Sequence, residues 1–489
     1  MSEAEDSHVF NIDKSNFSGW FSEILKTADL VDLRYDVKGF VVYKPWLMRM
    51  AKELYSSWEK ELESRGHDPT LFPVVIPEEN FEREKDHVEG FSPEVFWVTR
   101  AGDSDLEERL ALRPTSEAAF YTLYSLWIRS HSDLPLKLYQ SCAVYRYDTK
   151  ATKPLIRGRE FLWIEAHDVF ETEDQALAQV ESDIETTRAI LEGLLGIPML
   201  FFRRPAFDKF PGAVDTYAAD ALMPDGRAVQ LPSTHNLGQG FAKSYGIIFE
   251  DAKGEKRIPH QTCYGPPISR SLAALISIHG DRKGLVLPFP IAPTQVVIVP
   301  IIYRGHREAV LEKCHELAEA LKQAGLRATV DQSDRNPGMK FYYWEMKGVP
   351  VRAEIGPRDL ESGAVTLVRR DTGEKTQVNF EKCLEAVRGM GMDIVDKLRE
   401  RASEELHDHI AEADDMESLS DHLASRGGFV RIPFCSRDFD GEECAERIKE
   451  LTDGEVRGTI FGDDQVPENL ECVVCGEPAT CFVMVARSY

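Results

Sequence analysis

Apolar positions in the N-terminal part of the chain alternate between helical and strand-like spacing. Phenylalanine, tryptophan and isoleucine recur at helical intervals over residues 17–28, and Pro45 opens a second helix that extends to about residue 63. Residues 39–43 and 71–77 are predicted to be strands. Pro73 cannot donate a ladder hydrogen bond, so the second strand belongs at a sheet edge or an interface. Residues 1–16 are expected to form a poorly ordered N-terminal segment.

Short apolar runs alternate with charged loops between about residues 94 and 290, and few long helices are expected there. This pattern predicts a mostly antiparallel sheet with flanking helices, an α+β domain. We expect the strands to be residues 95–100, 109–113, 137–146, 161–170, 198–204, 215–222 and 227–231.

Residues 230–240 are densely polar and directly follow the last of these strands. Hydroxyl, amide and imidazole groups concentrated in a loop beside a sheet are typical of a polar ligand site. The alternative is an ordinary turn-rich connection.

The pattern changes after a proline-punctuated linker at residues 285–293. A fully apolar strand at 295–301 precedes a helix at 306–324, which Gly325 ends, and a second strand at 327–331. This βαβ alternation predicts a separate α/β domain with a parallel sheet, reaching about residue 400.

A charged helix over about residues 381–415 leads into a cysteine-rich end, which we expect to be a small α+β domain. The predicted domains are therefore residues 17–288, 292–400 and 405–489.

Composition supports an ordinary soluble protein with several domains. The chain has 489 residues, of which 43% are hydrophobic and 29% are charged. No apolar run approaches the ~18 residues that span a bilayer, so no membrane partner is expected. The acidic, polar N-terminus resembles neither a signal peptide nor a transit peptide, and we expect a cytoplasmic protein. A net charge of −25 argues against nonspecific nucleic-acid binding, but an RNA could still dock on a local basic face.

The candidate chemistry is concentrated between residues 112 and 167. Thr115, Ser116 and Glu117 are followed by arginines at 146, 157 and 159. One carboxylate with neighbouring hydroxyls suits an ammonium ion, and clustered arginines suit a polyphosphate. Arg270 lies at a predicted helix start, where it opposes the helix dipole unless it has an anionic partner. The alternative for the segment around Arg157 is a hairpin with a solvated, charged tip.

Five of the nine cysteines lie in the last 55 residues. Cys435, Cys444, Cys472 and Cys475 could supply the four thiolates of a tetrahedral structural zinc site. The spacing of the second pair is typical of zinc sites, whereas the eight residues between the first pair are unusual. Cys481 is a substitute ligand, and a disulfide or free buried thiols are the alternatives, with a disulfide disfavoured in a reducing compartment.

Three segments resemble the signature motifs of class II aminoacyl-tRNA synthetases. The strand around Pro73 is similar to the first, dimer-forming motif, and Arg146-Tyr147-Asp148 to the Arg-x-Glu of the second, with Asp in place of Glu. Ser269-Arg270 and the following helix resemble the third. Thr115-Ser116-Glu117 resembles the TxE loop of the prolyl enzymes. The resemblance covers nearly the whole chain, and residues 159–167 and 234–239 narrow it to the archaeal and eukaryotic-like prolyl subgroup, which carries a C-terminal zinc-binding extension.

The resemblance implies ATP-dependent activation of L-proline to prolyl-adenylate, release of pyrophosphate, and transfer of proline to tRNA(Pro). ATP would be a substrate, with Mg²⁺, and Zn²⁺ would be structural. The implied catalytic residues are Arg146 and Arg270. The implied proline-binding residues are Thr115, Glu117, Arg146, Trp163, His167, His235 and Ser269. The implied ATP-binding residues are Arg146, Asp148, Arg157, Gly158, Phe161, Gln230, Ser233 and Arg270. Two prolines within the third motif leave open whether Ile268 or Ser269 faces the amino acid.

Residues 292–400 are similar to the anticodon-binding domain of several of these enzymes. Candidate contacts to the anticodon are Arg352, Glu354, Arg358, Arg369 and Arg370, with a solvated sheet edge as the alternative. The resemblance further implies a homodimer and a chain end at Tyr489 that folds back toward the active site. The roughly seventy residues between Arg157 and Gln230 are too few for an editing domain, so none is expected in cis.

Two alternatives use the same fold, and a third belongs to another functional class. Seryl enzymes share the TxE loop but carry an N-terminal coiled coil and lack a domain like residues 292–400. Threonyl enzymes use a catalytic zinc whose ligands we do not identify in this core. A catalytically silent relative that binds RNA or a protein is expected to have lost Arg146 or Arg270, and both are present.

Overall fold

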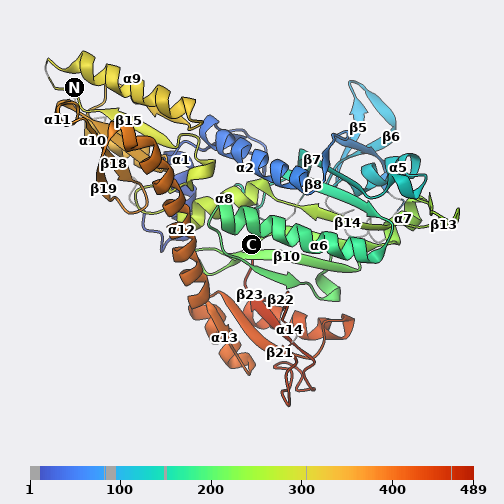
Figure 1. Ribbon diagram of the computed structural model, residues 1–489. Helices are drawn as coiled ribbons and strands as arrows, with labels where there is room; N and C mark the ends of the chain where they lie inside the picture. The colour runs from blue at the N-terminus through green and yellow to red at the C-terminus, as the bar shows by residue number, and fades with distance from the viewer. Residues whose placement is uncertain (1–11, 82, 84–94, 148–150, 304, 464) are drawn as a thin grey trace.

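The computed structural model describes residues 12–81, 83, 95–147, 151–303, 305–463 and 465–489. In Figure 1 a central sheet flanked by helices lies between two smaller regions, one carrying β15, β18 and β19 and the other β21, β22 and β23. The long helix α12 runs from one of these regions to the other. Within the described residues, no helix is both long and apolar enough to cross a membrane.

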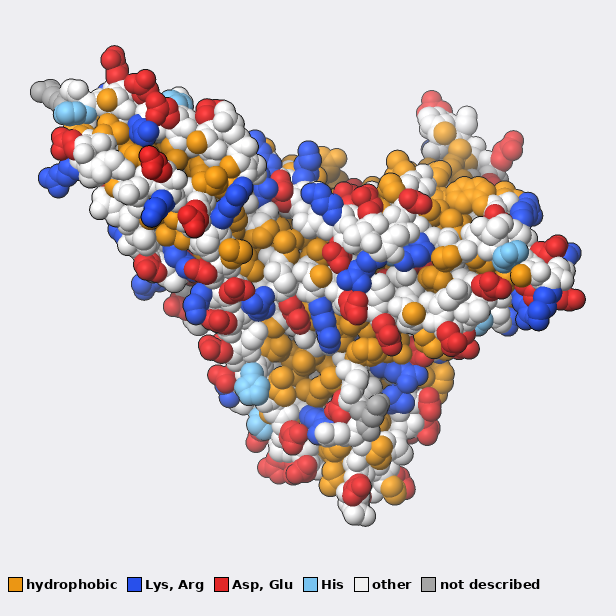
Figure 2. Space-filling view, in the orientation of Figure 1, with side chains coloured by type: hydrophobic (Ala, Val, Ile, Leu, Met, Phe, Trp, Pro, Cys, Tyr) orange, Lys and Arg blue, Asp and Glu red, His pale blue; other side chains and the backbone are white. Residues whose placement is uncertain are grey.

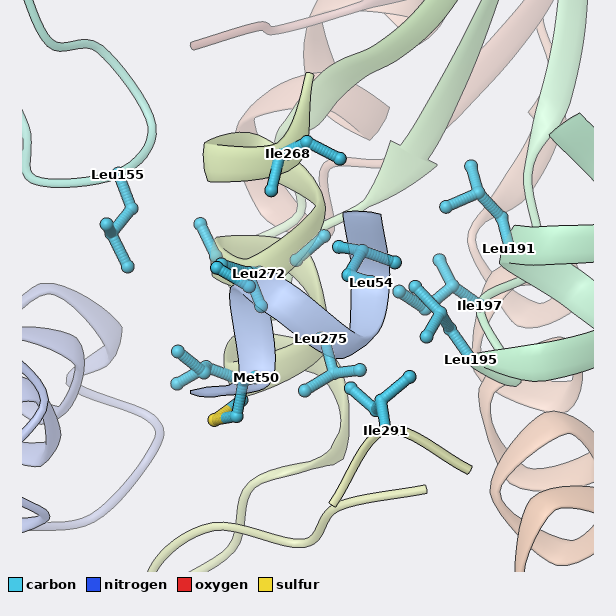
Figure 3. Packing of buried hydrophobic residues seen from close by; sticks show 14 of the residues in the cluster. Met50, Leu54, Leu155, Leu191, Leu195, Ile197, Ile268, Leu272, Leu275 and Ile291 are labelled. Carbon is cyan, nitrogen blue, oxygen red and sulfur yellow. The ribbon is translucent and has the colours of Figure 1, made fainter. Parts of the chain in front are cut away.

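The N-terminal helices match the prediction. They are α1 (Phe17–Thr27) and α2 (Pro45–Ser64), with Pro45 in the first turn of α2. Of the strand expected at 39–43, only β2 (Val42–Tyr43) forms, paired with β1 (Val31–Asp32). Figure 3 shows Met50 and Leu54 of α2 beside Leu272 and Leu275 of α8 (Ile268–His279), in the main hydrophobic core.

The central part of the main sheet is antiparallel, as expected, except for a short parallel strand at its end. Its order is β9-β10-β11-β14-β8-β7-β3, and only the β3–β7 pair is parallel. The strands are β3 (Asp68–Pro69), β7 (Leu136–Tyr145), β8 (Glu160–Phe170), β9 (Leu200–Arg203), β10 (Asp215–Leu222), β11 (Ala228–Gly238) and β14 (His260–Gly265). The prediction of an α+β catalytic domain is confirmed.

The loop expected at residues 230–240 is mostly strand, because β11 continues to Gly238. Its polar side chains bond within the protein, which makes them compatible with a buried strand. The Thr234 hydroxyl donates to Asp183 Oδ2 at 2.7 Å, for example, and the Thr216 hydroxyl bonds to His235 Nδ1 at 2.9 Å.

The described part of this region holds few long helices, as expected. Helix α5 (Glu117–Trp127) begins within the TxE segment, and α6 (Glu173–Arg188) continues into a π-helical segment, Ala189–Leu194. Thr172 and Gln175 form a capping box at the start of α6, which is a local sequence signal for the beginning of a helix.

A separate small sheet carries the first-motif strand. Its order is β4-β6-β5, so β4 (Val75–Pro77) is an edge strand, as Pro73 and Pro77 favour. The other strands are β5 (Phe96–Ala101) and β6 (Ser104–Leu112), and α3 (Glu78–Phe81) follows β4. Further short elements are α7 (Gly240–Tyr245), β12 (Phe249–Glu250) and β13 (Lys256–Arg257).

The region after the linker holds a mixed sheet of order β16-β15-β17-β18-β19. The three strands β15, β16 and β17 are parallel, as predicted, while β18 and β19 add antiparallel pairs. The strands are β15 (Val296–Pro300), β16 (Ala328–Val330), β17 (Val351–Ile355), β18 (Ala364–Arg369) and β19 (Lys375–Asn379). The helices are α9 (Arg307–Gln323), α10 (Pro337–Met346) and α11 (Pro357–Ser362).

The linker is part of the core. Leu285, Leu287 and Ile291 are fully buried in the same cluster as Val297 of β15, which joins the two regions by apolar contact. A bidentate ion pair of Arg370 with Asp281, at 2.7 and 2.8 Å, adds a second connection between these regions.

The C-terminal region extends the central sheet. Helix α12 (Cys383–Asp408) runs through residue 400 without a break, and β22 pairs with β9 through Thr459–Arg203 and Ile460–Phe202. This pairing makes one eleven-stranded sheet. The elements after α12 are β20 (Ile410–Glu412), α13 (Met416–Ser425), β21 (Phe429–Phe434), α14 (Glu442–Thr452), β22 (Glu455–Ile460) and β23 (Cys481–Ala486).

A buried ionic triad reinforces this junction. Asp220 of β10 is fully buried and accepts hydrogen bonds from Arg204 at 2.9 Å and from Arg457 of β22 at 2.6 Å. Burial by itself raises the pKa of Asp220, but the two arginines outweigh it and hold the pKa below its usual value. The carboxylate is therefore charged and binds the C-terminal region to the catalytic sheet.

Replacing Asp220 by Asn leaves two buried guanidinium groups without their shared anion, so the protein should lose about 3–5 kcal/mol of stability. Urea denaturation, followed by both circular dichroism and tryptophan fluorescence, measures this loss. The control is Glu400→Gln, which removes one partner of the exposed pair with Lys397. An Asp220→Asn midpoint equal to that of the control would contradict the role of the triad.

Candidate active site

A cavity of about 200 Å³ lies at the face of the catalytic sheet. Thr115 and Glu117 contribute from the start of α5, and most of the other side chains come from β8, β11 and β14. A further wall comes from the segment between Arg204 and Phe210, which follows β9. The predicted site residues that line this cavity are Thr115, Glu117, Arg146, Phe161, Trp163, His167, Gln230, Ser233, His235 and Arg270.

Strand register explains why these residues meet. Trp163, Glu165 and His167 occupy alternate positions on β8, so their side chains leave the same face of the sheet. Cys263 of β14 lies opposite His167, and His235 of β11 lies opposite Cys263. A row of polar side chains therefore crosses three neighbouring strands.

Gly265 leaves room for the indole of Trp163. A Cβ atom at this position would lie 2.3 Å from Trp163 Cζ2, which no side chain could tolerate. Gly265 thus allows the Trp163 ring to pack directly against β14.

Glu117 is the first residue of α5 and is 2% exposed. A carboxylate at a helix N-terminus is stabilised by the helix dipole. The Thr115 hydroxyl donates a hydrogen bond to Glu117 Oε2. The side-chain amide of Gln140 connects this segment to β8, because it donates to the Ser116 hydroxyl at 2.8 Å and to Glu165 Oε2 at 3.1 Å.

The two histidines of the row have opposite electrostatic surroundings. Burial, together with the nearby cations His167, Arg146 and Arg204, lowers the pKa of His235 to about 3, so its ring is neutral. Burial also lowers the pKa of His167, but Glu165 and Glu117 outweigh this effect and raise it above its usual value. His167 therefore favours its charged form beside the carboxylates.

Two arginines approach the cavity from different elements. Arg146, directly after β7, donates from Nε to the Pro114 carbonyl at 2.9 Å, and its guanidinium lies 5.5 Å from the Phe161 ring centroid. Arg270 donates from Nε to the Ile156 carbonyl at 2.9 Å and from Nη1 to the Gln230 carbonyl at 3.3 Å. Backbone carbonyls hold both side chains, and both line the space where an anion could bind.

Two of the predicted ATP contacts lie elsewhere. Arg157 and Gly158 line a neighbouring cavity of about 250 Å³ together with Gly39. A Cβ on Gly158 would approach the Glu160 carbonyl oxygen to 2.8 Å, so a glycine is needed here. Asp148 lies outside the described residues.

The end of the chain packs beside this second cavity. The Tyr489 hydroxyl donates to Asp225 Oδ2 at 2.5 Å and accepts from Lys153 at 3.3 Å, and the Lys153 ammonium lies 4.5 Å from the Tyr489 ring centroid. The C-terminus thus folds back onto the segment that carries Arg157.

Ser269 was expected to face the amino acid, with Ile268 as the alternative, but neither lines the cavity. The Ser269 hydroxyl accepts from the Leu162 amide at 2.9 Å and bonds to the Tyr43 hydroxyl at 2.6 Å. Ile268 is buried among apolar side chains, as Figure 3 shows. Cys263, Tyr264 and Gly265 of β14 line the cavity instead, because the first two residues of the helix, Ile268 and Ser269, are directed away from it.

Arg204 is a cavity residue that sequence reasoning missed. Its guanidinium donates to Gln230 Oε1 at 3.2 Å as well as to Asp220, so the buried triad reaches a predicted ATP contact. Glu165, Thr216 and Phe210 also line the cavity without having been predicted. The alternation along β8 could have indicated Glu165, whereas the other three depend on tertiary pairing.

Comparisons with known proteins identify three domains along the chain. A family model described as "tRNA synthetase class II core domain (G, H, P, S and T)" matches residues 96–279, and "Anticodon binding domain" matches 295–390. A third model, "Prolyl-tRNA synthetase, C-terminal", matches residues 416–489.

Similar proteins match over nearly the full length. The proline–tRNA ligase of Thermofilum pendens is 55% identical over 477 residues, covering 97% of this chain and 98% of that protein. That of Pyrococcus abyssi is 43% identical with the same coverage. The chain belongs to the proline–tRNA ligase family. The prolyl-tRNA synthetase of Giardia lamblia, solved in complex with prolyl-adenylate, superimposes with a TM-score of 0.94 at 37% identity, covering 98% of this chain and 99% of that one.

The C-terminal region of this family member brings the four predicted zinc ligands together. One sulfur atom each from Cys435, Cys444, Cys472 and Cys475 lies within 4.8 Å of the other three, and all four are free thiols. Burial raises the pKa of Cys472, but neighbouring backbone N–H groups outweigh it and lower the pKa, which favours the thiolate. Cys481 is outside the cluster, and its sulfur lies 3.7 Å from the Phe434 carbonyl oxygen. The donor set fits tetrahedral zinc.

The five candidate anticodon contacts have different surroundings. Arg352 bonds to Glu354 at 3.0 Å and Glu345 at 3.1 Å, and Arg369 bonds to Asp371 at 2.8 Å. Arg370 is held by Asp281 of the catalytic region. Arg358 is exposed at the start of α11. Arg370 therefore connects two regions of this family member, and Arg358 faces solvent.

The low pKa of His235 predicts a pH effect on stability. In the unfolded chain a histidine takes up a proton near pH 6.5, whereas folded His235 stays neutral down to about 3. The unfolded state then binds more protons, so the contribution of His235 is full above pH 6.5 and declines as the pH falls toward 3.

We expect the stability difference between the wild type and His235→Asn to shrink by up to about 2 kcal/mol between pH 7.5 and pH 5. Urea denaturation at both pH values measures it. A difference that stays constant would show that His235 is protonated in the folded protein at pH 5.

Proposed function

We propose that this protein is a proline–tRNA ligase. It activates L-proline with ATP to prolyl-adenylate, releasing pyrophosphate, and then transfers proline to the 3′ end of tRNA(Pro). The observation that carries the proposal is the buried Glu117 carboxylate in one cavity with Arg146 and Arg270. An amino acid's ammonium and a nucleotide's phosphates need these opposite charges side by side.

Glu117 is placed to hold the proline ammonium. Thr115 already donates to Oε2, so the hydroxyl orients the carboxylate and leaves its other oxygen for the substrate. Proline has a secondary amine and supplies two N–H donors when protonated. His167, Trp163 and the neutral His235 form further walls of the cavity, whose volume of about 200 Å³ favours a small amino acid.

The reaction needs alignment and positive charge but no protein nucleophile. A carboxylate oxygen of proline attacks the α-phosphorus of ATP, a new P–O bond forms, and the bond to pyrophosphate breaks. Arg146 is proposed to contact the α-phosphate and Arg270 the γ-phosphate, where they stabilise charge that develops in the transition state. Phe161 and the Gln230–Ser233 segment supply the adenosine site, and Arg157 and Gly158 its outer rim. ATP is proposed to bind with Mg²⁺.

Several finer features are proposed with it. A structural Zn²⁺ is proposed to bind the cluster of Cys435, Cys444, Cys472 and Cys475, where it would link the end of β21 to α14.

Arg358 is the preferred anticodon contact, because the other candidate arginines have intramolecular partners. The span between Arg157 and Gln230 is filled by α6, β9 and β10, which supports the absence of cis editing. The cluster of thiols supports a cytoplasmic location.

Replacing Glu117 by Gln removes the anionic partner of a buried ammonium, and we expect kcat/KM for proline to fall by about 100-fold or more. ATP–pyrophosphate exchange measured with each of the twenty amino acids tests both substrate and residue. The matched control is Glu173→Gln, since Glu173 also begins a helix but is exposed.

Proline must give the highest exchange rate in the wild type. A preference for serine or threonine would support the rival synthetases, and no exchange at all would support a silent relative. A normal proline KM in Glu117→Gln would contradict the assignment of Glu117.

A homodimer is supported by an exposed apolar patch near the first-motif strand. Leu71 is 76% exposed and Val74 39%, and on α5 Leu126 is 57% and Trp127 46% exposed. Figure 2 shows hydrophobic side chains gathered over this part of the surface, where Figure 1 places α5. Contiguous patches of this kind mark interaction sites.

The double variant Leu71→Asp, Trp127→Asp should convert a dimer, twice 55.3 kDa, into a monomer of 55.3 kDa. A charge placed in an apolar interface is left unpaired, which opposes association. Light scattering coupled to gel filtration measures the mass. Leu451→Asp, at an exposed apolar position on α14, is the control and should stay dimeric. A monomeric wild type would refute the dimer.

A further inference from the structure

Three side chains of the amino-acid end of the cavity have the composition of a metal site. One ligand atom each from Glu117, His167 and Cys263 lies within 4.8 Å of the other two, and all three residues are buried. They come from α5, β8 and β14, so only tertiary structure brings an oxygen, a nitrogen and a sulfur donor together.

A second observation points to a ligand at this place. His167 is 1% exposed, and among the described residues Nε2 of its imidazole has no hydrogen-bond partner. Glu165 Oε2 forms a long ion pair with this nitrogen at 4.0 Å, beyond hydrogen-bond distance. A buried ring nitrogen without a partner is unfavourable unless something else binds it.

The surroundings of the three donors resemble a supported metal site. The Tyr121 hydroxyl lies 3.3 Å from His167 Nδ1, and the Thr115 hydroxyl donates to Glu117. Such outer partners orient ligands and raise their affinity for a metal. Thiolate and imidazole donors favour zinc and its chemical relatives over magnesium or calcium, which prefer oxygen alone. Three protein ligands would leave one coordination position open.

We propose that Glu117, His167 and Cys263 bind a thiophilic divalent cation such as Zn²⁺, and that this cation competes with proline. The competition rests on the proposed function, in which Glu117 holds the substrate ammonium. One carboxylate oxygen cannot accept from an ammonium and bind a cation at the same place. A rise in free Zn²⁺ therefore inhibits activation of the amino acid.

Binding is coupled to loss of two protons. The charged His167 imidazole gives one of them to solvent, which frees a ring nitrogen for the cation. The Cys263 thiol gives its proton to solvent as sulfur bonds to the cation, and neither the metal nor the sulfur changes oxidation state. Because binding releases protons, the affinity for metal increases with pH.

Cobalt(II) titration of the full-length, zinc-loaded protein tests the site directly. A thiolate-to-cobalt absorption band in the near ultraviolet should develop with one added equivalent, because the C-terminal cluster already holds zinc. Cys263→Ala should weaken cobalt binding by at least about tenfold. Loss of a residue that only orients a metal ligand already lowers the affinity by about that factor, and Cys263 is itself a proposed ligand. Cys142→Ala is the matched control, because Cys142 is a buried thiol of the same sheet outside the cluster.

Proline should displace the cobalt band, and Zn²⁺ should raise the KM for proline in pyrophosphate exchange without changing kcat. A band that persists in Cys263→Ala, or that never forms in the wild type, would overturn the site. A band that proline cannot displace would overturn the competition. If exchange is not proline-dependent, the proposed function fails, while the dependence of the cobalt band on Cys263 still decides the metal site.

Discussion

Antiparallel pairing of β8 with β14 and of β14 with β11 brings His167, Cys263 and His235 into one row, and the rest of the site is arranged around it. Side chains along a strand alternate between the two faces of the sheet. A shift of one residue in either pairing would therefore move the side chains of the shifted strand to the opposite face and break the row. The wall formed by Trp163 over Gly265 depends on the same register. Helix α5 then adds Glu117 at the open side of the row.

The C-terminal region takes part in this arrangement through the sheet. Strand β22 pairs with β9, and Arg457 shares Asp220 with Arg204, whose guanidinium reaches Gln230 in the cavity. A chain of contacts therefore extends from the region with the cysteine cluster to the proposed nucleotide site. The last residue adds a second path, because Tyr489 contacts Lys153 near Arg157.

Charge is distributed so that an acidic protein can still bind anions. The net charge is −25, and the face seen in Figure 2 carries acidic and basic side chains intermixed. At the cavity, however, Arg146 and Arg270 are fixed by backbone carbonyls. Local preorganised charge determines what binds there, whereas net charge affects long-range encounter and solubility.

The sequence by itself determined most of the catalytic strands, the two N-terminal helices, the cysteine cluster and half of the residues that line the cavity. These features depend on local periodicity, on spacing, or on motif segments such as Thr115-Ser116-Glu117. Only the tertiary structure decided that the polar segment after residue 230 is a buried strand, since its hydroxyls and imidazole bond to distant residues such as Asp183 and Thr216. It also decided that Ser269 turns away from the cavity, that Arg370 joins two regions, and that Cys263 faces Glu117. Each of these outcomes depends on pairings between residues far apart in the chain, which local patterns do not encode.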